Sequence, residues 1–148
     1  HGFGWATLDR TSFDKRELSD DFTGTTSGLW AITTAVYLSL LGPRGMRELG
    51  IGIMQRSEYA SQMLGSLRGV NSPRFSTPVL KEFVVNFNQT GKTVEEIHNQ
   101  LLKHGIIGGI DLSNSFPELG ESALYCVTEM NSLADLSKLE GALEEVLD

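Results

Sequence analysis

The sequence predicts an α+β fold in which a small, mainly antiparallel sheet is flanked by helices. Segments with helical periodicity and segments with strand alternation follow each other along the chain, and the strand segments are few and not consecutive. The 148 residues have the length of a single domain, and 40% of them are hydrophobic, which is enough for one packed core.

Charge and cysteine content narrow the classes of partner. Nineteen acidic and twelve basic side chains give a net charge of -7, which would repel both nucleic-acid phosphates and an anionic lipid surface. The single cysteine, Cys126, cannot form an internal disulfide, and no signal-peptide pattern opens the chain. We therefore expect a cytoplasmic protein with neither a nucleic-acid nor a membrane partner.

The first 21 residues predict a short strand followed by a charged arm. Phe3, Trp5 and Thr7 alternate with small residues, and the positions after them are mostly polar or charged. The chain opens on HGFGWATL, without a methionine and already in strand-like composition. We therefore expect residues 1–148 to be one domain cut from a longer protein.

A helix that is apolar on almost every side is predicted over residues 27–41. Ser27 can cap its start, and Gly42 with Pro43 ends it and begins the next helix. The apolar segment is too short to cross a bilayer core of ~30 Å. Such a helix needs neighbours all round, so either a large domain absent from this chain covers it, or the chain's own elements bury it.

The next helix and strand are one-sided. Apolar residues recur every three or four positions between Met46 and Leu67, which predicts a helix that packs on one neighbour. In the segment KEFVVNF, the side chains of Phe83, Val85 and Phe87 share one face of a half-buried strand.

The remaining residues predict a helix, two short strands and a last helix. Thr93 and Glu96 have the spacing of a capping box. A short strand is expected within residues 106–112, and the segment 123–128 is apolar on both faces, which is typical of a central strand. Ser132 is the expected cap of the last helix.

Three features that resemble functional sites have simpler interpretations. The run GKT at 91–93 matches the end of a phosphate-binding loop, but the glycine that should open the loop is missing. His98 and His104 do not have metal-ligand spacing, so we expect surface histidines and no metal site. Cys126 lies in an apolar strand and is expected to be an inert core residue.

Four segments resemble, in order and spacing, the carboxyl-terminal part of the glycine decarboxylase P-protein, specifically subunit 1 of its two-subunit form. These segments are DFTGTTSGLWAITTAVYLSLLGPRGMRELG, KEFVVNF, GIIGGIDLSNSFPELG and ALYCVTE. The resemblance covers nearly the whole chain and is weakest in the first twenty residues.

The resemblance implies the small domain of a fold-type-I pyridoxal-phosphate enzyme that decarboxylates glycine and passes an aminomethyl group to the lipoyl H-protein. The implied partners are a large domain of the same subunit, glycine dehydrogenase subunit 2 and the lipoyl H-protein. The resemblance also implies that subunit 2 holds the cofactor lysine and carries pyridoxal phosphate. None of the lysines of this chain matches that lysine; they are Lys15, Lys81, Lys92, Lys103 and Lys138. This chain alone is therefore expected to hold no cofactor and no catalytic residue, and to be inactive.

Two groups of residues are candidates for contact with substrate or partner. Arg10 or Arg16 could hold a substrate carboxylate with its planar guanidinium, or both could simply pair with acidic residues of the arm. Gly108, Gly109 and the polar run that includes Ser113 are expected to form a loop that faces the domain or subunit junction, with an ordinary turn as the alternative.

A second class of function stays open at this point. Composition equally allows a stand-alone α+β module with a binding or regulatory role and no enzymatic ancestry. The length of the natural chain discriminates between the two, because only the enzyme interpretation requires several hundred preceding residues.

Overall fold

The computed structural model describes residues 28–148, which divide between two compact units. The first unit ends at Arg44, and the second, called the core unit below, comprises Gly45–Asp148. The strand and charged arm predicted over residues 1–21 lie outside the described residues. The two units are described separately below.

Helix α1 (Gly28–Gly65) is interrupted at Gly42, where φ is 59° and ψ is -176°. These angles lie in a region that glycine adopts without steric cost and that other residues avoid. Pro43 follows at the first position of the next helical stretch, where its missing N–H leaves no hydrogen bond unmade. The prediction that Gly42 and Pro43 separate two helices is confirmed.

The part of α1 that precedes Gly42 has exposed side chains from residue 28 to residue 40. Burial of this helix by the chain's own elements, one of the two expectations from the sequence, is not seen among the described residues. No helix in the described part of the chain has the length and apolar content to cross a bilayer. The apolar surface of this helix therefore needs another explanation.

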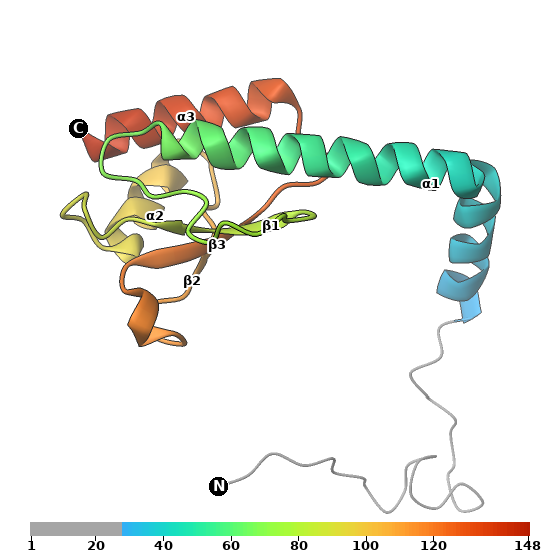
Figure 1. The fold of residues 1–148 in the computed structure, drawn as a ribbon, viewed down its shortest axis with the longest axis horizontal. Helices are drawn as coiled ribbons and strands as arrows, with labels where there is room; N and C mark the ends of the chain where they lie inside the picture. The colour runs from blue at the N-terminus through green and yellow to red at the C-terminus, as the bar shows by residue number, and fades with distance from the viewer. Residues whose placement is uncertain (1–27) are drawn as a thin grey trace, which may run out of the picture. The chain divides into compact units, whose positions relative to one another are not determined.

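The second unit combines a three-stranded antiparallel sheet with helices (Figure 1), which confirms the predicted α+β class. The strand order is β1-β3-β2, so β3 is central, as its composition predicts. The strands are β1 (Glu82–Asn86), β2 (Ile110–Asp111) and β3 (Ser122–Cys126). The helices are the later part of α1, α2 (Val94–Lys103) and α3 (Leu133–Leu147), with a short 3-10 helix η2 (Pro117–Leu119).

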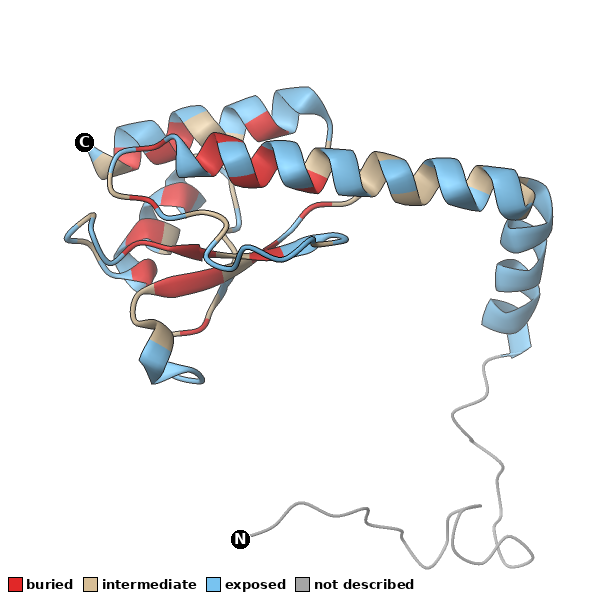
Figure 2. Ribbon diagram, viewed as in Figure 1, coloured by how far each residue is buried: buried red, intermediate tan, exposed pale blue. Residues whose placement is uncertain are grey.

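One face of the sheet carries the hydrophobic core. Phe83, Val85 and Phe87 project from β1 and the residue after it, as the alternation in the sequence predicts, and all three are buried. Figure 2 shows buried residues on all three helices and on the sheet. The helical residues of the core are Ala60, Met63, Leu64, Val94, Ile97, Leu101, Leu136, Ala142, Leu143 and Val146.

The opposite face of the sheet is only partly covered by the described residues: Asn86 and Ser122 are buried there beside Leu119 of η2. Val84 and Leu124 are paired across β1 and β3 and are only half-buried, while Ile110, paired with Leu124 on β2, is exposed. Cys126 is also exposed, so the prediction that it is a core residue is wrong. Alternation along β3 places its side chain on the face opposite to Tyr125.

Local hydrogen bonds fix the start of α2 as predicted. The Glu96 amide donates to Thr93 Oγ1 at 3.2 Å, and the Thr93 amide donates to Glu96 Oε2 at 2.8 Å, which completes the capping box. The ammonium of Lys92 donates to the carbonyl of Val146 at the end of α3. Lys92 therefore ties the turn that precedes α2 to the end of α3.

Two helical glycines should respond in opposite directions to alanine. A Cβ atom on Gly65 would lie 2.3 Å from the Ser72 carbonyl oxygen, whereas one on Gly141 in α3 would meet nothing within 4 Å. We expect Gly65→Ala to lower the free energy of unfolding by ~1–3 kcal/mol through overpacking. Gly141→Ala should raise it by up to ~1 kcal/mol through helix propensity.

Urea unfolding of both variants, followed by circular dichroism, measures the difference. Because both are glycine-to-alanine changes in a helix, propensity is common to the pair and the contact with Ser72 is what differs. Equal shifts of the unfolding midpoint would contradict the close approach at Gly65.

Candidate functional site

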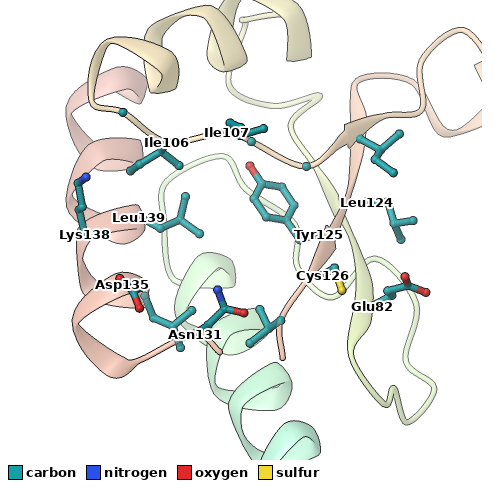
Figure 3. Close-up of a pocket in the computed structure, with 16 residues that line it drawn as sticks. Glu82, Ile106, Ile107, Leu124, Tyr125, Cys126, Asn131, Asp135, Lys138 and Leu139 are labelled. Carbon is teal, nitrogen blue, oxygen red and sulfur yellow. The ribbon is translucent and has the colours of Figure 1, made fainter. Parts of the chain in front are cut away.

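A cavity of about 430 Å³ lies beside the loop of residues 105–110 (Figure 3). This loop, which joins α2 to β2, forms one wall, and residues 124–127 at the end of β3 form another. The third wall comes from the start of α3 and the turn before it, with Asn131, Asp135 and Lys138 as its polar side chains. The rest of the lining is largely aliphatic.

The loop backbone is pressed against two other elements of the same unit. A Cβ atom on Gly109 would lie 2.5 Å from the Leu124 carbonyl oxygen, and one on Gly108 would lie 2.3 Å from His98 Cδ2. Neither glycine has a positive φ, so close approach and not backbone conformation requires the missing side chains. The surfaces that the glycine pair approaches are those of α2 and β3.

The loop also covers part of His98. The side chain is half-buried and Nε2 has no hydrogen-bond partner, so the prediction of a surface histidine is wrong for His98. Burial lowers the pKa of His98, and the Asp111 carboxylate partly opposes that shift. The pKa of Asp111 is itself lowered, mainly by the Ser113 side chain, with a smaller effect from the Ser113 amide, which donates to Asp111 Oδ1 at 2.8 Å.

Tyr125 projects from β3 between the core and the loop. Its ring stacks near Phe83, with 6.2 Å between the ring centroids. Burial raises the pKa of Tyr125 to about 12, although the Gly109 backbone acts in the opposite direction. The hydroxyl is shielded from solvent, and the Gly109 backbone is a polar group near it. Tyr125 therefore stays neutral near neutral pH and cannot serve as a base.

The cavity does not fit pyridoxal phosphate. Lys138 is the one cationic side chain in its lining, and a phosphate group would lie among the carboxylates of Glu82 and Asp135. Asp135 is committed to capping α3, since it accepts from the Ser132 amide at 2.8 Å and from the Ser132 hydroxyl at 2.6 Å. These hydrogen bonds lower the pKa of Asp135 and keep it ionised.

The part of the chain that the structure describes contains no candidate metal-binding site. No group of three or more histidine, cysteine, aspartate or glutamate side chains is gathered there in a way that could hold a metal ion. The second histidine, His104, has Nε2 at 3.9 Å from Glu145 Oε2 near the end of α3. Both groups are accessible to solvent, and such a pair contributes little to stability.

The candidate residues from the sequence fall in different places. Arg10 and Arg16 lie outside the described residues. Gly108 and Gly109 form a wall of the cavity, and Ser113 follows β2 in the turn that it makes with Asp111. The contact of this loop with a domain or subunit junction stays a prediction.

Several residues around the cavity have no signal in the sequence. Asn131, Asp135 and Lys138 are distant in sequence from the loop that they face, and no spacing rule links them. The pair of adjacent glycines was the available signal, because it marks a point where the backbone passes close to something. The sequence could not say that Tyr125 and His98 were the groups approached.

Comparison with known proteins gives relatives that are all longer than this chain. A protein from Staphylothermus marinus is 40% identical over 124 residues, which is 84% of this chain and 26% of the relative. A protein from Coxiella burnetii is 35% identical over 145 residues, 98% of this chain and 32% of the relative. Both are named probable glycine dehydrogenase (decarboxylating) subunit 1. No family model matches the chain.

A solved structure agrees with these relatives. The inhibitor-bound glycine decarboxylase P-protein of the glycine cleavage system matches 95% of this chain with a TM-score of 0.74 and 28% sequence identity. The match covers 31% of that protein's chain, so this chain spans about a third or less of the proteins it resembles. This chain is therefore homologous to part of glycine dehydrogenase (decarboxylating) subunit 1, of the glycine decarboxylase P-protein family.

Proposed function

We propose that this chain is the small domain of subunit 1 of a glycine dehydrogenase that decarboxylates glycine and transfers the aminomethyl group to a lipoyl H-protein. The observation that carries the proposal is the match of 98% of the chain to a subunit 1 relative, at 35% identity. The likeness of fold to a glycine decarboxylase P-protein supports it. On this proposal the chain is one component of a larger catalytic assembly.

The proposed contribution of this chain is structural. In such enzymes pyridoxal phosphate, when bound, supplies the electron sink for decarboxylation, and we place it on subunit 2. The chemistry of the cavity supports that placement, because the cavity pairs one lysine with two carboxylates. The chain would then shape the entrance to the active site and the contacts between domains and between subunits.

The proposal predicts that the isolated chain forms no specific aldimine with pyridoxal phosphate. Lys92 and Lys103 are engaged by Val146 and Gln100, and Lys138 shares its cavity with two carboxylates. After incubation with pyridoxal phosphate and borohydride reduction, peptide mapping should find only scattered, substoichiometric labelling. Lys138→Arg is the matched control, since it removes the one lysine of the cavity. Stoichiometric labelling that glycine displaces and Lys138→Arg abolishes would contradict the prediction.

A second prediction concerns the arginines of the amino-terminal arm. If Arg10 or Arg16 holds the carboxylate of glycine, its replacement by alanine should raise the KM for glycine in the assembled two-subunit enzyme by ~10-fold or more, because a charge-assisted hydrogen bond is lost. Arg68→Ala is the control, because it removes an exposed arginine from the second unit of the chain and not from the arm. Unchanged kinetics for both arm variants would mean that neither arginine holds the substrate, and that the alternative, pairing with acidic residues of the arm, applies.

A third prediction tests whether the loop of residues 105–110 faces a junction. Gly109→Val is not informative, because its side chain would collide with the chain's own Leu124 carbonyl. Ile107 is 88% exposed, so Ile107→Arg should leave the stability of this chain unchanged.

In the assembled enzyme the same change should weaken association of the subunits or domains, because it places a charge in an apolar contact. Met130→Arg, at a comparably exposed apolar position, is the matched control. Analytical ultracentrifugation of the assembly measures both variants. Equal behaviour of the two would mean that nothing docks on the loop.

A further inference from the structure

The helix that precedes Gly42 carries apolar side chains over most of its circumference. Seven large apolar residues in it are 45% to 81% exposed: Leu29, Trp30, Ile32, Val36, Tyr37, Leu38 and Leu40. At 100° per residue they span an arc of roughly 240°. The remaining arc holds Ala31, Ala35 and Ser39, and no charged residue lies between residues 28 and 41.

This helix has little intrinsic support. Its length falls in the range, ~12–15 residues or fewer, in which isolated helices are marginal in water. The hydroxyls of Thr33 and Ser39 donate to the carbonyls four residues earlier, at 2.9 and 2.7 Å, an arrangement that slightly weakens a helix. Its first turn has no acidic residue that could interact favourably with the positive end of the helix dipole. Tertiary packing must therefore supply its stability.

The exposed area exceeds what a soluble monomer usually presents. Side chains of this size, about half to four-fifths exposed, offer on the order of 700 Å² of apolar surface, against ~300–600 Å² for the largest patch of a typical monomer. Contiguous apolar surface of that extent marks a protein contact. The remaining question is what covers it.

We propose that the helix of residues 28–41 docks into the part of the same polypeptide that, in the relatives, lies outside the segment represented by this chain. The inference rests on the proposed function and identifies the surface that joins the small domain to the rest of subunit 1. The occupant is a concave, apolar surface that surrounds most of the helix.

The length of the relatives supports this occupant. About two thirds of the Coxiella burnetii relative lies beyond the matched residues, and the matched P-protein chain is covered over only 31% of its length. Because 95% of this chain takes part in that structural match, the match includes at least part of the helix. A similar element is thus found in a polypeptide with ample additional chain.

The geometry disfavours a second copy of this chain as the occupant. In a symmetric dimer each helix would cover one stripe of its partner, about 100° wide, and would leave more than half of the apolar arc in water. A surface that wraps the helix requires several elements of a larger domain. Docking within one long polypeptide supplies them without the loss of translational freedom that association of separate chains involves.

Hydrogen–deuterium exchange of residues 28–41 tests the proposal in two contexts. The first is the 148-residue chain, and the second is the full-length Coxiella burnetii relative in which its matched 145 residues are replaced by this chain. The helix should exchange close to the unfolded rate in the first context. In the second it should be slowed by ~10-fold or more, the factor that corresponds to burial of one leucine.

Two equally exposed positions provide matched variants. Leu40 and Met130 are both 81% exposed in this chain. In the full-length protein Leu40→Gln should restore fast exchange of the helix by ~10-fold or more, while Met130→Gln should leave it unchanged. Neither change should alter exchange in the core of the isolated chain.

Three results would overturn the docking proposal. One is slow exchange of the helix in the isolated chain at every dilution, which would mean that its own residues cover it. Another is protection in the isolated chain that grows with concentration, which would identify a second copy as the occupant. The third is exchange that stays fast in the full-length protein.

An assay of glycine decarboxylation with subunit 2 separates this proposal from the proposed function. A full-length protein that protects the helix but is inactive would overturn the functional proposal and leave the docking intact. An active protein whose helix stays unprotected would do the reverse.

Discussion

The packing of three helices on one face of a three-stranded sheet is the constraint on which the core unit depends. Phe83, Val85 and Phe87 anchor that face, and all three helices direct their buried residues at it. Because the helices cover only this one face, the other side of β3 becomes more open along the strand, from Ser122, which is buried, through Leu124, which is half-buried, to Cys126, which is exposed.

The cavity beside residues 105–110 is a consequence of the same packing. Helix α2 and strand β3 share a core, so the connection that leaves α2 for β2 has to pass close to both of them. Gly108 and Gly109 make that passage sterically feasible, and the passage shields a ring nitrogen of His98 and the hydroxyl of Tyr125. The result is a loop beside a partly polar cavity whose charged lining, one lysine and two carboxylates, does not suit a phosphate group.

The two units of the chain differ in how far their apolar side chains are buried. The unit Gly45–Asp148 gathers a buried core from its helices and its sheet, whereas the helix before Gly42 has no buried apolar residue among those described and exposes apolar side chains over most of its circumference. That contrast is expected for part of a larger fold, in which one portion of the segment is self-supporting and another is completed by neighbouring chain. It agrees with relatives of which this chain spans a third or less.

The sequence by itself determined the elements whose signals are local. Local signals of this kind are Gly42 with Pro43, the capping box that begins at Thr93, the cap at Ser132 and the alternation of KEFVVNF, each of which acts through residues a few positions apart. The resemblance to the P-protein family depended on ordered segments along one chain, so it too was readable from the sequence. The relatives and the fold support it.

Only the tertiary structure decided which face of a strand is covered and which groups meet across the chain. An apolar strand such as β3 is compatible with burial on both faces, and Cys126 is exposed although Ser122, on the same face of the strand, is buried. Likewise, the sequence marked Gly108 and Gly109 but not the close approach to His98 and Leu124. Such contacts depend on the relative positions of elements that are far apart in sequence, and no local spacing rule encodes those positions.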